Sequence, residues 1–481
     1  MLAYEELKGS DDRQIRFRPR RYAASRLFPS SSPRVRVRDA RYRLQDISLG
    51  GLAAVSSQTD NGLPSVGEHV PLTLHQGGLP IFESVAKVCR SENTVFGTKI
   101  AFSFIDQHVE FDKLLTRNAE AQIAARFDRL SSDAARAVPL EYRAFCADVL
   151  SILKGYRQLL EQNGAIASEF GGTLDRFAAF EACEEQMIQQ WRKLWLLGNE
   201  LTAGFAGDRD VRDAAKEYTE LVLTPELRLG AIWDRSYGKP MGYPGDFQIM
   251  NQVYDWQQVG RDTYEMLMHR IGLDVAECIG TRMEVVATHI AATMRQTQGR
   301  PARFLSLGSG PAREVETALR GRKPDEGACE FTLIDQEEEA LRYAHTKTFP
   351  FVQKSRGDVK VSGLHMSFTE ILRGAGAIEN LPPQDIIYSV GLLDYLTDAR
   401  CKALVQRLYK ALAPSGQLII GNMNACPDSN YWPMEYISDW SLHYRDHMTM
   451  IQWVDGLPGA DAWTETERTG RVRMLFVRKR S

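Results

Sequence analysis

The segment FLSLGSGPAREV, residues 304–315, is the feature that most constrains the fold of this chain. An apolar run leads into Gly308-Ser309-Gly310 and then into a helical pattern. Glycine allows a tight turn and a close approach of the backbone to a ligand. From Arg303 onward, apolar runs alternate with stretches that fit single helices, which predicts a mostly parallel, doubly wound sheet. The last two runs, WTETERT and RMLFVRK, flank a short turn and predict an antiparallel edge.

Two other zones precede this region. Short alternating or β-branched runs, separated by Gly, Pro, Asn and Ser, end near Phe104 and predict a small all-β barrel or sandwich, of which we favour the barrel. From Glu110 to about Gln298 the apolar period is helical. We therefore predict a multidomain α+β and α/β protein. Its parts are a β-barrel with an arginine-rich arm over 1–108, a helical domain over 109–298 and a Rossmann-like, doubly wound domain over 299–481.

Composition limits the classes of function. The 481 residues exceed the roughly 250–300 that one hydrophobic core serves. Lys+Arg 59 against Asp+Glu 62 gives a net charge of −3, so the chain as a whole is not a polyanion binder. Seven scattered cysteines without a CxxC pair argue against disulfides or a metal site and favour a reducing cytoplasm. No apolar run approaches the roughly 18 residues of a membrane span, and the acidic N-terminus lacks a secretory signal.

The glycine turn predicts a nucleotide-like cofactor. N–H groups at the start of the following helix would favour a carboxylate or phosphate. Asp335, 27 residues after Gly308, ends the run FTLID, where a carboxylate can accept both hydroxyls of a ribose. A dinucleotide fingerprint would need glycine at the position of Arg313, which weakens an NAD interpretation. The run ending in HMSF, residues 365–368, supplies a candidate adenine wall.

The order of these features resembles that of class I S-adenosylmethionine-dependent methyltransferases over residues 300–481. The resemblance implies that Gly308 and Gly310 flank the methionine part of the cofactor and that Asp335 binds its ribose. It also implies that Ser367 and Phe368 lie beside the adenine. Two positions depart from the family pattern: Ser306 replaces a frequent acidic residue, and Ala312 replaces the third glycine of the turn.

A second resemblance narrows the class. The segments WDRSYGKPMGYPGDFQIMNQVYDW (233–256), YSVGLLDYL and GNMNACPDSNYWPMEYISDWSLHYR resemble a bacterial group of methyltransferases for 3-hydroxy-fatty-acid methyl ester signals. The GYPGD stretch, 242–246, is either a helix-breaking turn or a lid over the methyl donor. As a lid it would present Tyr243 and Asp246 to the substrate.

The chemistry of methyl transfer selects candidate residues. The protein must align acceptor, methyl group and sulfur, and a carboxylate acceptor needs no base, whereas a hydroxyl or a protonated amine does. Arg445 could clamp a substrate carboxylate with two hydrogen bonds, and His443 could act as a base. Nucleic acid fits worse, because SVGL (389–392) lacks the motif of base-amine methylases and the C-terminal region lacks a sustained basic stripe. The substrate-side candidates are Tyr243, Asp394, Tyr395, Glu435, Trp440, His443 and Arg445.

An arginine cluster marks the N-terminal region. Between Arg13 and Arg43 the chain has eleven arginines, no lysine and one acid, Asp39. Arginine forks bind phosphate and stack on flat bases. The cluster precedes a DxSxxG turn, and together they resemble a PilZ domain, the bacterial cyclic di-GMP receptor. The resemblance implies a ligand site of Arg16, Arg20, Asp46, Ser48 and Gly51, although other nearby arginines leave the register open.

The leading hypothesis is a cyclic di-GMP-controlled methyltransferase that acts on a small molecule, such as the carboxylate of a hydroxy fatty acid. It would use S-adenosylmethionine and no metal, and it could form a homodimer. One alternative is a non-catalytic cyclic di-GMP receptor whose degenerate methyltransferase domain binds a partner, and a third is a protein carboxyl methylase. RNA or an anionic membrane surface remains an alternative target for the arginines, although only Phe17 and Tyr22 could stack on bases.

Overall fold

The structure is a computed structural model of the 481-residue chain. The residues that it describes are 3–6, 15–18, 21–28, 32–38, 40–56, 63–94, 97–131, 137–323, 326–355, 357–366, 370, 378 and 380–480. By contacts within the chain it divides into two compact units. The first is Met1–Ala137 with Gly238–Tyr243, and the second is Val138–Tyr237 with Pro244–Ser481.

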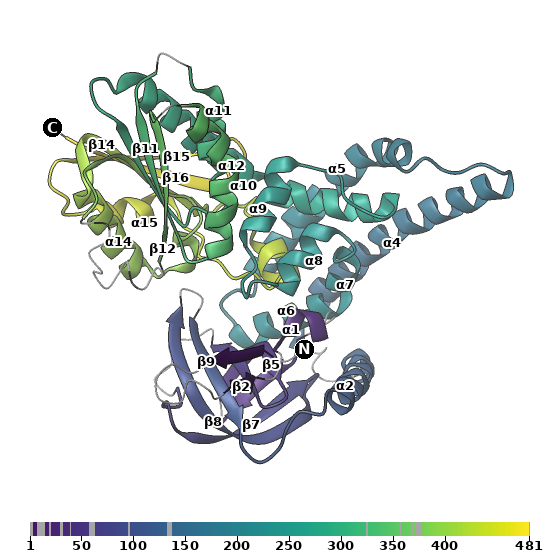
Figure 1. The fold of residues 1–481 in the computed structure, drawn as a ribbon. Coiled ribbons are helices and arrows are strands. Elements are labelled where there is room, and N and C mark those ends of the chain that lie inside the picture. Colours follow the sequence, from purple (N-terminus) through teal and green to yellow (C-terminus); the bar gives the residue numbers. More distant parts are fainter. Residues whose placement is uncertain are drawn as a thin grey trace. The chain divides into compact units, whose positions relative to one another are not determined.

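The first unit is built on a closed antiparallel barrel, which confirms the predicted β-barrel (Figure 1). Its strands follow the order β5-β4-β7-β8-β9-β6, and pairing of β5 with β6 closes the ring. Alternate residues of β4 and β7 point inward, so that Val35, Val37, Val70 and Leu72 are buried. The strands are β3 (Tyr22–Ala23), β4 (Arg34–Val37), β5 (Ala40–Ser48), β6 (Gly51–Ser56), β7 (His69–Gln76), β8 (Leu79–Thr94) and β9 (Gly97–Phe104).

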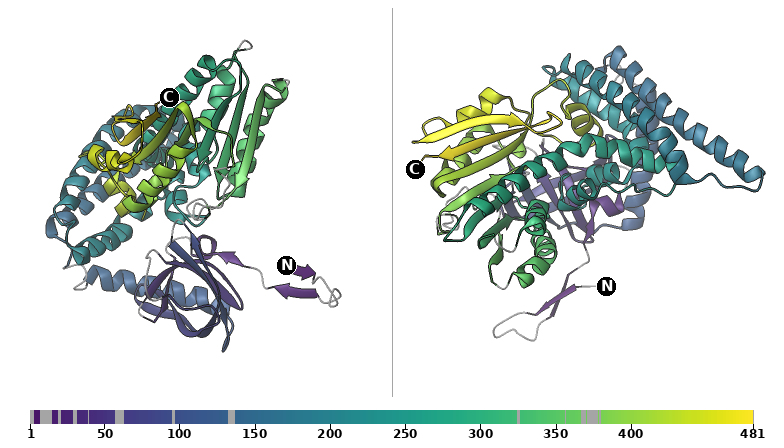
Figure 2. Two further views of the ribbon diagram at one scale, coloured as in Figure 1. Left: turned by 90° about the vertical axis from the view of Figure 1, so that its left-hand side faces the viewer. Right: turned by 90° about the horizontal axis from the view of Figure 1, so that it is seen from above.

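Two helices and a hairpin complete this unit. The hairpin pairs β1 (Ala3–Glu6) with β2 (Ile15–Arg18) and is clearest in the left view of Figure 2. The short helix α1 (Ala24–Leu27) precedes β4, and α2 (Phe111–Ser131) follows β9. Leu114 on α2 is buried in the same core as the barrel.

The second unit contains a seven-stranded sheet of order β12-β11-β10-β13-β14-β16-β15. All neighbours are parallel except β16, which runs antiparallel to β14 and β15. The predicted doubly wound sheet with an antiparallel edge is confirmed. The strands are β10 (Ala302–Leu307), β11 (Cys329–Asp335), β12 (Val359–His365), β13 (Gln384–Ser389), β14 (Leu412–Met423), β15 (Ala460–Thr466) and β16 (Val472–Lys479).

Helices cover both faces of this sheet. In Figure 1, α10 (Thr263–Gln296), α11 (Arg313–Gly321) and α12 (Glu338–Lys354) lie together on one face, and α14 (Asp398–Lys410) lies on the other. Three short turns of helix complete the C-terminal part: η1 (Leu393–Tyr395), η2 (Pro433–Ile437) and η3 (Gln452–Val454). Helix α15 (His447–Ile451) precedes η3.

The remaining helices belong to the region predicted as helical, and they share one hydrophobic core with the sheet. The predicted domain border at residue 298 therefore falls inside the second unit, where α10 leads into β10. These helices are α4 (Leu140–Glu169), α5 (Arg176–Ala203), α6 (Arg209–Val222), α7 (Thr224–Leu227), α8 (Ala231–Gly238) and α9 (Phe247–Asp255). No helix in the described part of the chain is long and apolar enough to cross a membrane.

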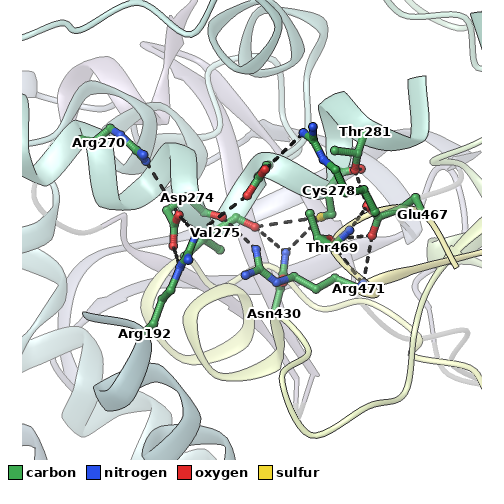
Figure 3. Close-up of polar contacts among 12 residues, drawn as sticks. Arg192, Arg270, Asp274, Val275, Cys278, Thr281, Asn430, Glu467, Thr469 and Arg471 are labelled. Carbon is green, nitrogen blue, oxygen red and sulfur yellow. Dashed lines mark hydrogen bonds and ion pairs between the residues drawn. The ribbon is translucent and has the colours of Figure 1, made fainter. Parts of the chain in front are cut away.

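A largely buried polar network joins α10 to α5 and to the loops at one end of the sheet (Figure 3). Asp274 on α10 accepts two hydrogen bonds from Arg192, at 2.9 and 2.6 Å, and its backbone carbonyl accepts one from Arg471 at 2.9 Å. Glu467 accepts the backbone N–H of Arg471 at 2.9 Å, and Asn430 donates to the Val275 carbonyl at 2.7 Å. Because buried polar groups are costly unless they are paired, this network fixes how α10 packs against the sheet.

All seven cysteines are free thiols. Burial raises the pKa of Cys146 and Cys401 to about 12 and that of Cys278 to about 11. Cys89 on β8 is the one that is exposed.

Gly198→Ala is expected to destabilise the second unit. An added Cβ would lie 2.7 Å from Cγ and 2.8 Å from Cε2 of Trp432, whose ring is fully buried and donates a hydrogen bond to Tyr142 at 2.9 Å. We expect the free energy of unfolding to fall by about 1–3 kcal/mol, measured by urea titration. The matched control is Gly155→Ala on α4, where a Cβ meets nothing within 4 Å, and it should be neutral or stabilising. Equal behaviour of the two variants would contradict this packing.

Candidate functional site

The glycine turn lies at the carboxyl end of β10, at the centre of the sheet. Gly308 and Gly310 have φ values of 68° and 50°, in the left-handed region that favours glycine. An added Cβ at Gly310 would meet nothing within 4 Å, so the space beside it is open. At Gly308 it would lie 3.4 Å from Cβ of Leu392, in the segment that follows β13. The turn therefore faces the end of the neighbouring strand and leaves room for a ligand.

Ala312, at the third position of the turn, is also left-handed, with φ 51°, and is fully buried. This position thus adopts the backbone conformation for which glycine is the usual residue. Ser306, the other departure from the family pattern, is buried on β10. The hydroxyl of Ser309 is buried and has no hydrogen-bond partner within the described ranges.

Asp335 ends β11, and its carboxylate is bonded to the glycine turn. One oxygen accepts the N–H of Gly310 at 2.8 Å, and the other accepts the N–H of Glu337 at 2.9 Å. Burial raises the pKa of Asp335, against the effect of these two hydrogen bonds. Burial and then the charge of Asp335 raise the pKa of Glu337 to about 7. A carboxylate has about four lone-pair positions, so Asp335 can still accept ligand hydroxyls.

Asp394 lies just beyond β13 and is 2 % exposed. Its carboxylate accepts the N–H of Met423 at 2.7 Å and lies 3.6 Å from Nη1 of Arg282 on α10. Burial raises the pKa of Asp394 to about 6, and the charge of Arg282 opposes that rise. The backbone N–H of His443 donates to the Asp394 carbonyl at 2.8 Å. The ends of β13 and β14 therefore meet at this carboxylate.

Tyr395 and Trp440 form a pair that packs against Gly245. Nε1 of Trp440 donates to the Tyr395 hydroxyl at 2.9 Å. A Cβ on Gly245 would overlap Cζ2 of Trp440 and lie 2.9 Å from that hydroxyl. Burial raises the pKa of Tyr395, and the nearby Asp394 raises it further. Part of the GYPGD stretch thus lies directly on two of the predicted substrate-side residues.

Arg445 is placed differently from the expectation that it clamps a substrate. It is 4 % exposed, and its donors are already engaged. Nε donates to Asp398 at 2.7 Å and Nη1 to Asn422 at 2.7 Å, and Nη1 and Nη2 also donate to the carbonyls of Leu393 and Leu396. The guanidinium holds both ends of η1, the turn that carries Asp394.

The other substrate-side candidates have separate surroundings. His443 lies at the surface, and partial desolvation of its ring together with the charge of Arg445 lowers its pKa. Glu435 pairs with Lys216 on α6 at 2.7 Å. Tyr243 is half-buried and groups with the first unit, whereas Asp246 belongs to the second.

Asp246 caps α9 instead of facing open space. It is fully buried, accepts the N–H groups of Gln248 and Ile249 at 2.9 and 3.1 Å, and pairs with Arg235 at 2.8 Å. This placement gives it a structural role at the start of the helix.

Asp246→Ala is expected to lower the free energy of unfolding by about 2 kcal/mol or more, because it removes both the cap and the partner of Arg235. Asp246→Asn keeps a capping oxygen and should recover about 1 kcal/mol of that loss. Urea titrations of the two variants check this, and equal stabilities would show that the cap contributes nothing.

The predicted nucleotide site of the barrel is described only in part. Arg20 lies outside the described residues, and so does the side chain of Arg16. Asp46 pairs with Arg21 at 2.5 Å, and the Ser48 hydroxyl donates to the Gly51 carbonyl at 3.1 Å. A Cβ on Gly51 would overlap the carbonyl oxygen of Phe102 on β9, so this glycine is required for strand packing.

Arg282, which lies beside Asp394, was not among the residues predicted from the sequence. Its signal was a charged residue at helical spacing from Val275 and Cys278, which are both buried. Two predicted adenine-side residues, Ser367 and Phe368, lie outside the described residues. Among the residues that are described, no group of three or more His, Cys, Asp or Glu could hold a metal ion.

No protein-family model and no curated protein matches the sequence. Solved structures do match. One is a possible exported protein from Bordetella parapertussis (TM-score 0.39, 16% identity, 63% of this chain and 97% of that one). Another is magnesium protoporphyrin IX methyltransferase from Synechocystis with bound SAH (0.35, 11%, 51% and 97%). A third is an O-methyltransferase family 2 protein from Planctomyces limnophilus in complex with apigenin (0.32, 15%, 61% and 95%). We therefore assign the fold, a doubly wound α/β sheet, from the strand order of this chain and not from these similarities.

Proposed function

We propose that the second unit is an S-adenosylmethionine-dependent methyltransferase for a small-molecule acceptor. The observation that carries the proposal is the bond between the Asp335 carboxylate and the Gly308–Gly310 turn, at the carboxyl edge of this sheet. In open α/β sheets, ligands bind at the carboxyl ends of the strands, where the strand order reverses. That reversal lies between β10 and β13, beside this turn.

The residues of the turn fit this cofactor. The open space beside Gly310 admits its amino-acid part, and Asp335 retains lone pairs for the ribose hydroxyls. When bound, the sulfonium supplies an activated methyl group. The side chains of Ser367 and Phe368 remain the proposed adenine contacts.

The residues beyond β13 would bind and orient the acceptor. Tyr395 and Trp440 would form one apolar wall with a hydroxyl in it, and Gly245 packs directly against that wall. Arg445 would act as a positioning residue that holds η1 and therefore Asp394. His443 remains a candidate for proton transfer, which a hydroxyl acceptor would need and a carboxylate acceptor would not. A hydroxy fatty acid is the acceptor that we favour.

Calorimetry and mass spectrometry test this function. Purified protein should bind S-adenosylhomocysteine at micromolar concentrations, and a cell extract incubated with protein and methyl-labelled donor should yield a labelled small molecule. Binding without a labelled product would favour the non-catalytic alternative, in which the unit only binds a partner. A base-labile label on protein would identify a carboxyl methylase instead.

The barrel is proposed to bind cyclic di-GMP and so regulate the enzyme. Four arginines of β4 and β5 lie opposite one another in pairs, Arg34 with Arg43 and Arg36 with Arg41. Like charges opposite each other in a sheet repel, and a bound polyanion would relieve that repulsion. Titration calorimetry with cyclic di-GMP tests this, with Arg16→Ala, Arg20→Ala and Asp46→Ala expected to weaken binding. Affinity that is unchanged in all three variants would exclude the proposed site.

A further inference from the structure

Arg282 is a buried arginine with unused hydrogen-bonding capacity. Its side chain is 8 % exposed, and its closest carboxylate oxygen is Oδ2 of Asp394, 3.6 Å from Nη1. At that distance the two groups attract as charges, but they form no hydrogen bond. Within the described ranges, no hydrogen bond from the Arg282 guanidinium is present. A guanidinium carries five N–H donors, so this side chain is under-satisfied.

Arg445, which lies on the other side of Asp394, provides the contrast. Its guanidinium donates to one carboxylate, one amide oxygen and two backbone carbonyls. Buried polar groups are normally satisfied in this way, and an exception calls for an explanation. The two arginines thus differ in the number of N–H donors that remain for a ligand. Arg445 has few such donors, whereas Arg282 retains most of them.

Arg282 also lies beside the segment after β13 that faces the glycine turn. A Cβ on Gly391 would be 2.7 Å from Nη2 of Arg282, so the absence of a side chain there leaves room for the guanidinium. Leu392, the next residue, is the one that faces Gly308. The Arg282 guanidinium therefore lies beside the residues that line the proposed cofactor and acceptor sites.

We propose that Arg282 binds a carboxylate of a ligand in this site. The inference rests on the proposed methyltransferase function and names a group that the site recognises. The planar guanidinium of Arg282 can donate two parallel hydrogen bonds to one carboxylate. Asp394 does not accept such a pair, because one of its oxygens accepts the Met423 N–H and the other lies 3.6 Å from Arg282. Two ligands carry such a group: the amino-acid end of the cofactor and a carboxylic acid acceptor.

The experiment uses two variants of the full-length chain. Arg282→Lys retains the charge, so Asp394 keeps a partner, but the bidentate fork is lost. Gly391→Ala keeps Arg282 and pushes a methyl group against Nη2. The matched controls are Arg295→Lys, exposed on the same helix, and Gly280→Ala, where the nearest atom to an added Cβ is 3.8 Å away. Circular dichroism and urea titration establish that each variant is folded.

Four probes separate the two sources of the carboxylate. S-adenosylhomocysteine carries the amino-acid end, and methylthioadenosine lacks it. 3-Hydroxydecanoate carries a free carboxylate, and its methyl ester does not. If Arg282 binds the cofactor, both variants should bind S-adenosylhomocysteine at least about 10-fold more weakly than the wild type does. Their affinity for methylthioadenosine should be unchanged. If Arg282 binds the acceptor, the affinities for both nucleosides should be unchanged in the two variants. The affinity for 3-hydroxydecanoate should fall about 10-fold, whereas that for its methyl ester should not change.

Affinities for all four probes within twofold of wild type, in both folded variants, would overturn the proposal. A wild-type protein that binds neither nucleoside would refute the methyltransferase function. In that case the 3-hydroxydecanoate measurement alone decides about Arg282. If Arg282→Lys then binds 3-hydroxydecanoate more weakly but its ester equally well, Arg282 forms a carboxylate site in a protein without methyl transfer. If the wild type does not bind 3-hydroxydecanoate, the proposal for Arg282 is overturned.

Discussion

Asp335→Asn is expected to weaken binding of S-adenosylhomocysteine by about 10- to 100-fold. Hydrogen bonds to a charged group contribute about 1.5–3 kcal/mol each, and an amide offers one acceptor oxygen where the carboxylate offers two. In the wild type both oxygens of Asp335 also hold backbone N–H groups, of Gly310 and Glu337. The amide must therefore turn its NH₂ toward one of them or toward the ligand. Titration calorimetry measures the change.

The matched control for this variant is Asp358→Asn. The Asp358 side chain is 63% exposed, and its ion pair with Arg322 is long, at 4.0 Å. It should bind S-adenosylhomocysteine as the wild type does. Urea titration of Asp335→Asn separates loss of the ligand contact from loss of the turn, because a collapsed turn would also lower stability. Wild-type affinity in a folded Asp335→Asn protein would place the cofactor elsewhere.

Gly245→Ala is expected to reduce the rate of methyl transfer by about 100-fold while leaving the affinity for S-adenosylhomocysteine within about threefold. The added methyl group must displace the Trp440 ring and break its hydrogen bond to Tyr395. A displacement of about 1 Å near a reacting group can cost about two orders of magnitude in rate. Turnover with labelled donor and calorimetry with S-adenosylhomocysteine give the two readouts.

Two further variants make the Gly245 result interpretable. Gly238→Ala, in the same stretch of chain, adds a Cβ that meets nothing within 4 Å and should be fully active. Trp440→Phe removes the Nε1 donor without a clash and should cost less than Gly245→Ala. Full activity of Gly245→Ala would show that the Tyr395–Trp440 pair has no part in binding the acceptor.

The elements of the sheet could be predicted because each strand is a continuous apolar run that ends in a turn residue. The runs RFLSLG and FTLID became β10 and β11, with the glycine turn and Asp335 at their carboxyl ends. Parallel strands bring such ends to one edge, so sequence position alone placed these residues together. The barrel was predictable for the same reason, from the alternation of residues in β4 and β7.

The roles of individual polar residues could not be predicted in this way. Arg445 and Asp246 follow motif-like segments, yet their hydrogen-bonding capacity is used within the chain, by η1 and by the start of α9. Partners from distant parts of the sequence decide such roles, and one sequence does not show them. Arg282 illustrates the converse, because its proposed role depends on its proximity to Gly391 and Asp394, more than 100 residues away in the sequence.

The distribution of the seven thiols allows a fluorescent label to be placed on the barrel. A maleimide reacts with the thiolate, and the high pKa values and burial of Cys146, Cys278 and Cys401 keep them protonated and shielded near neutral pH. Cys89 is exposed on β8, so a fluorophore can be attached there once the two half-buried thiols, Cys183 and Cys426, are replaced by serine. Fluorescence anisotropy of that label would then follow ligand binding to the N-terminal unit in the full-length protein.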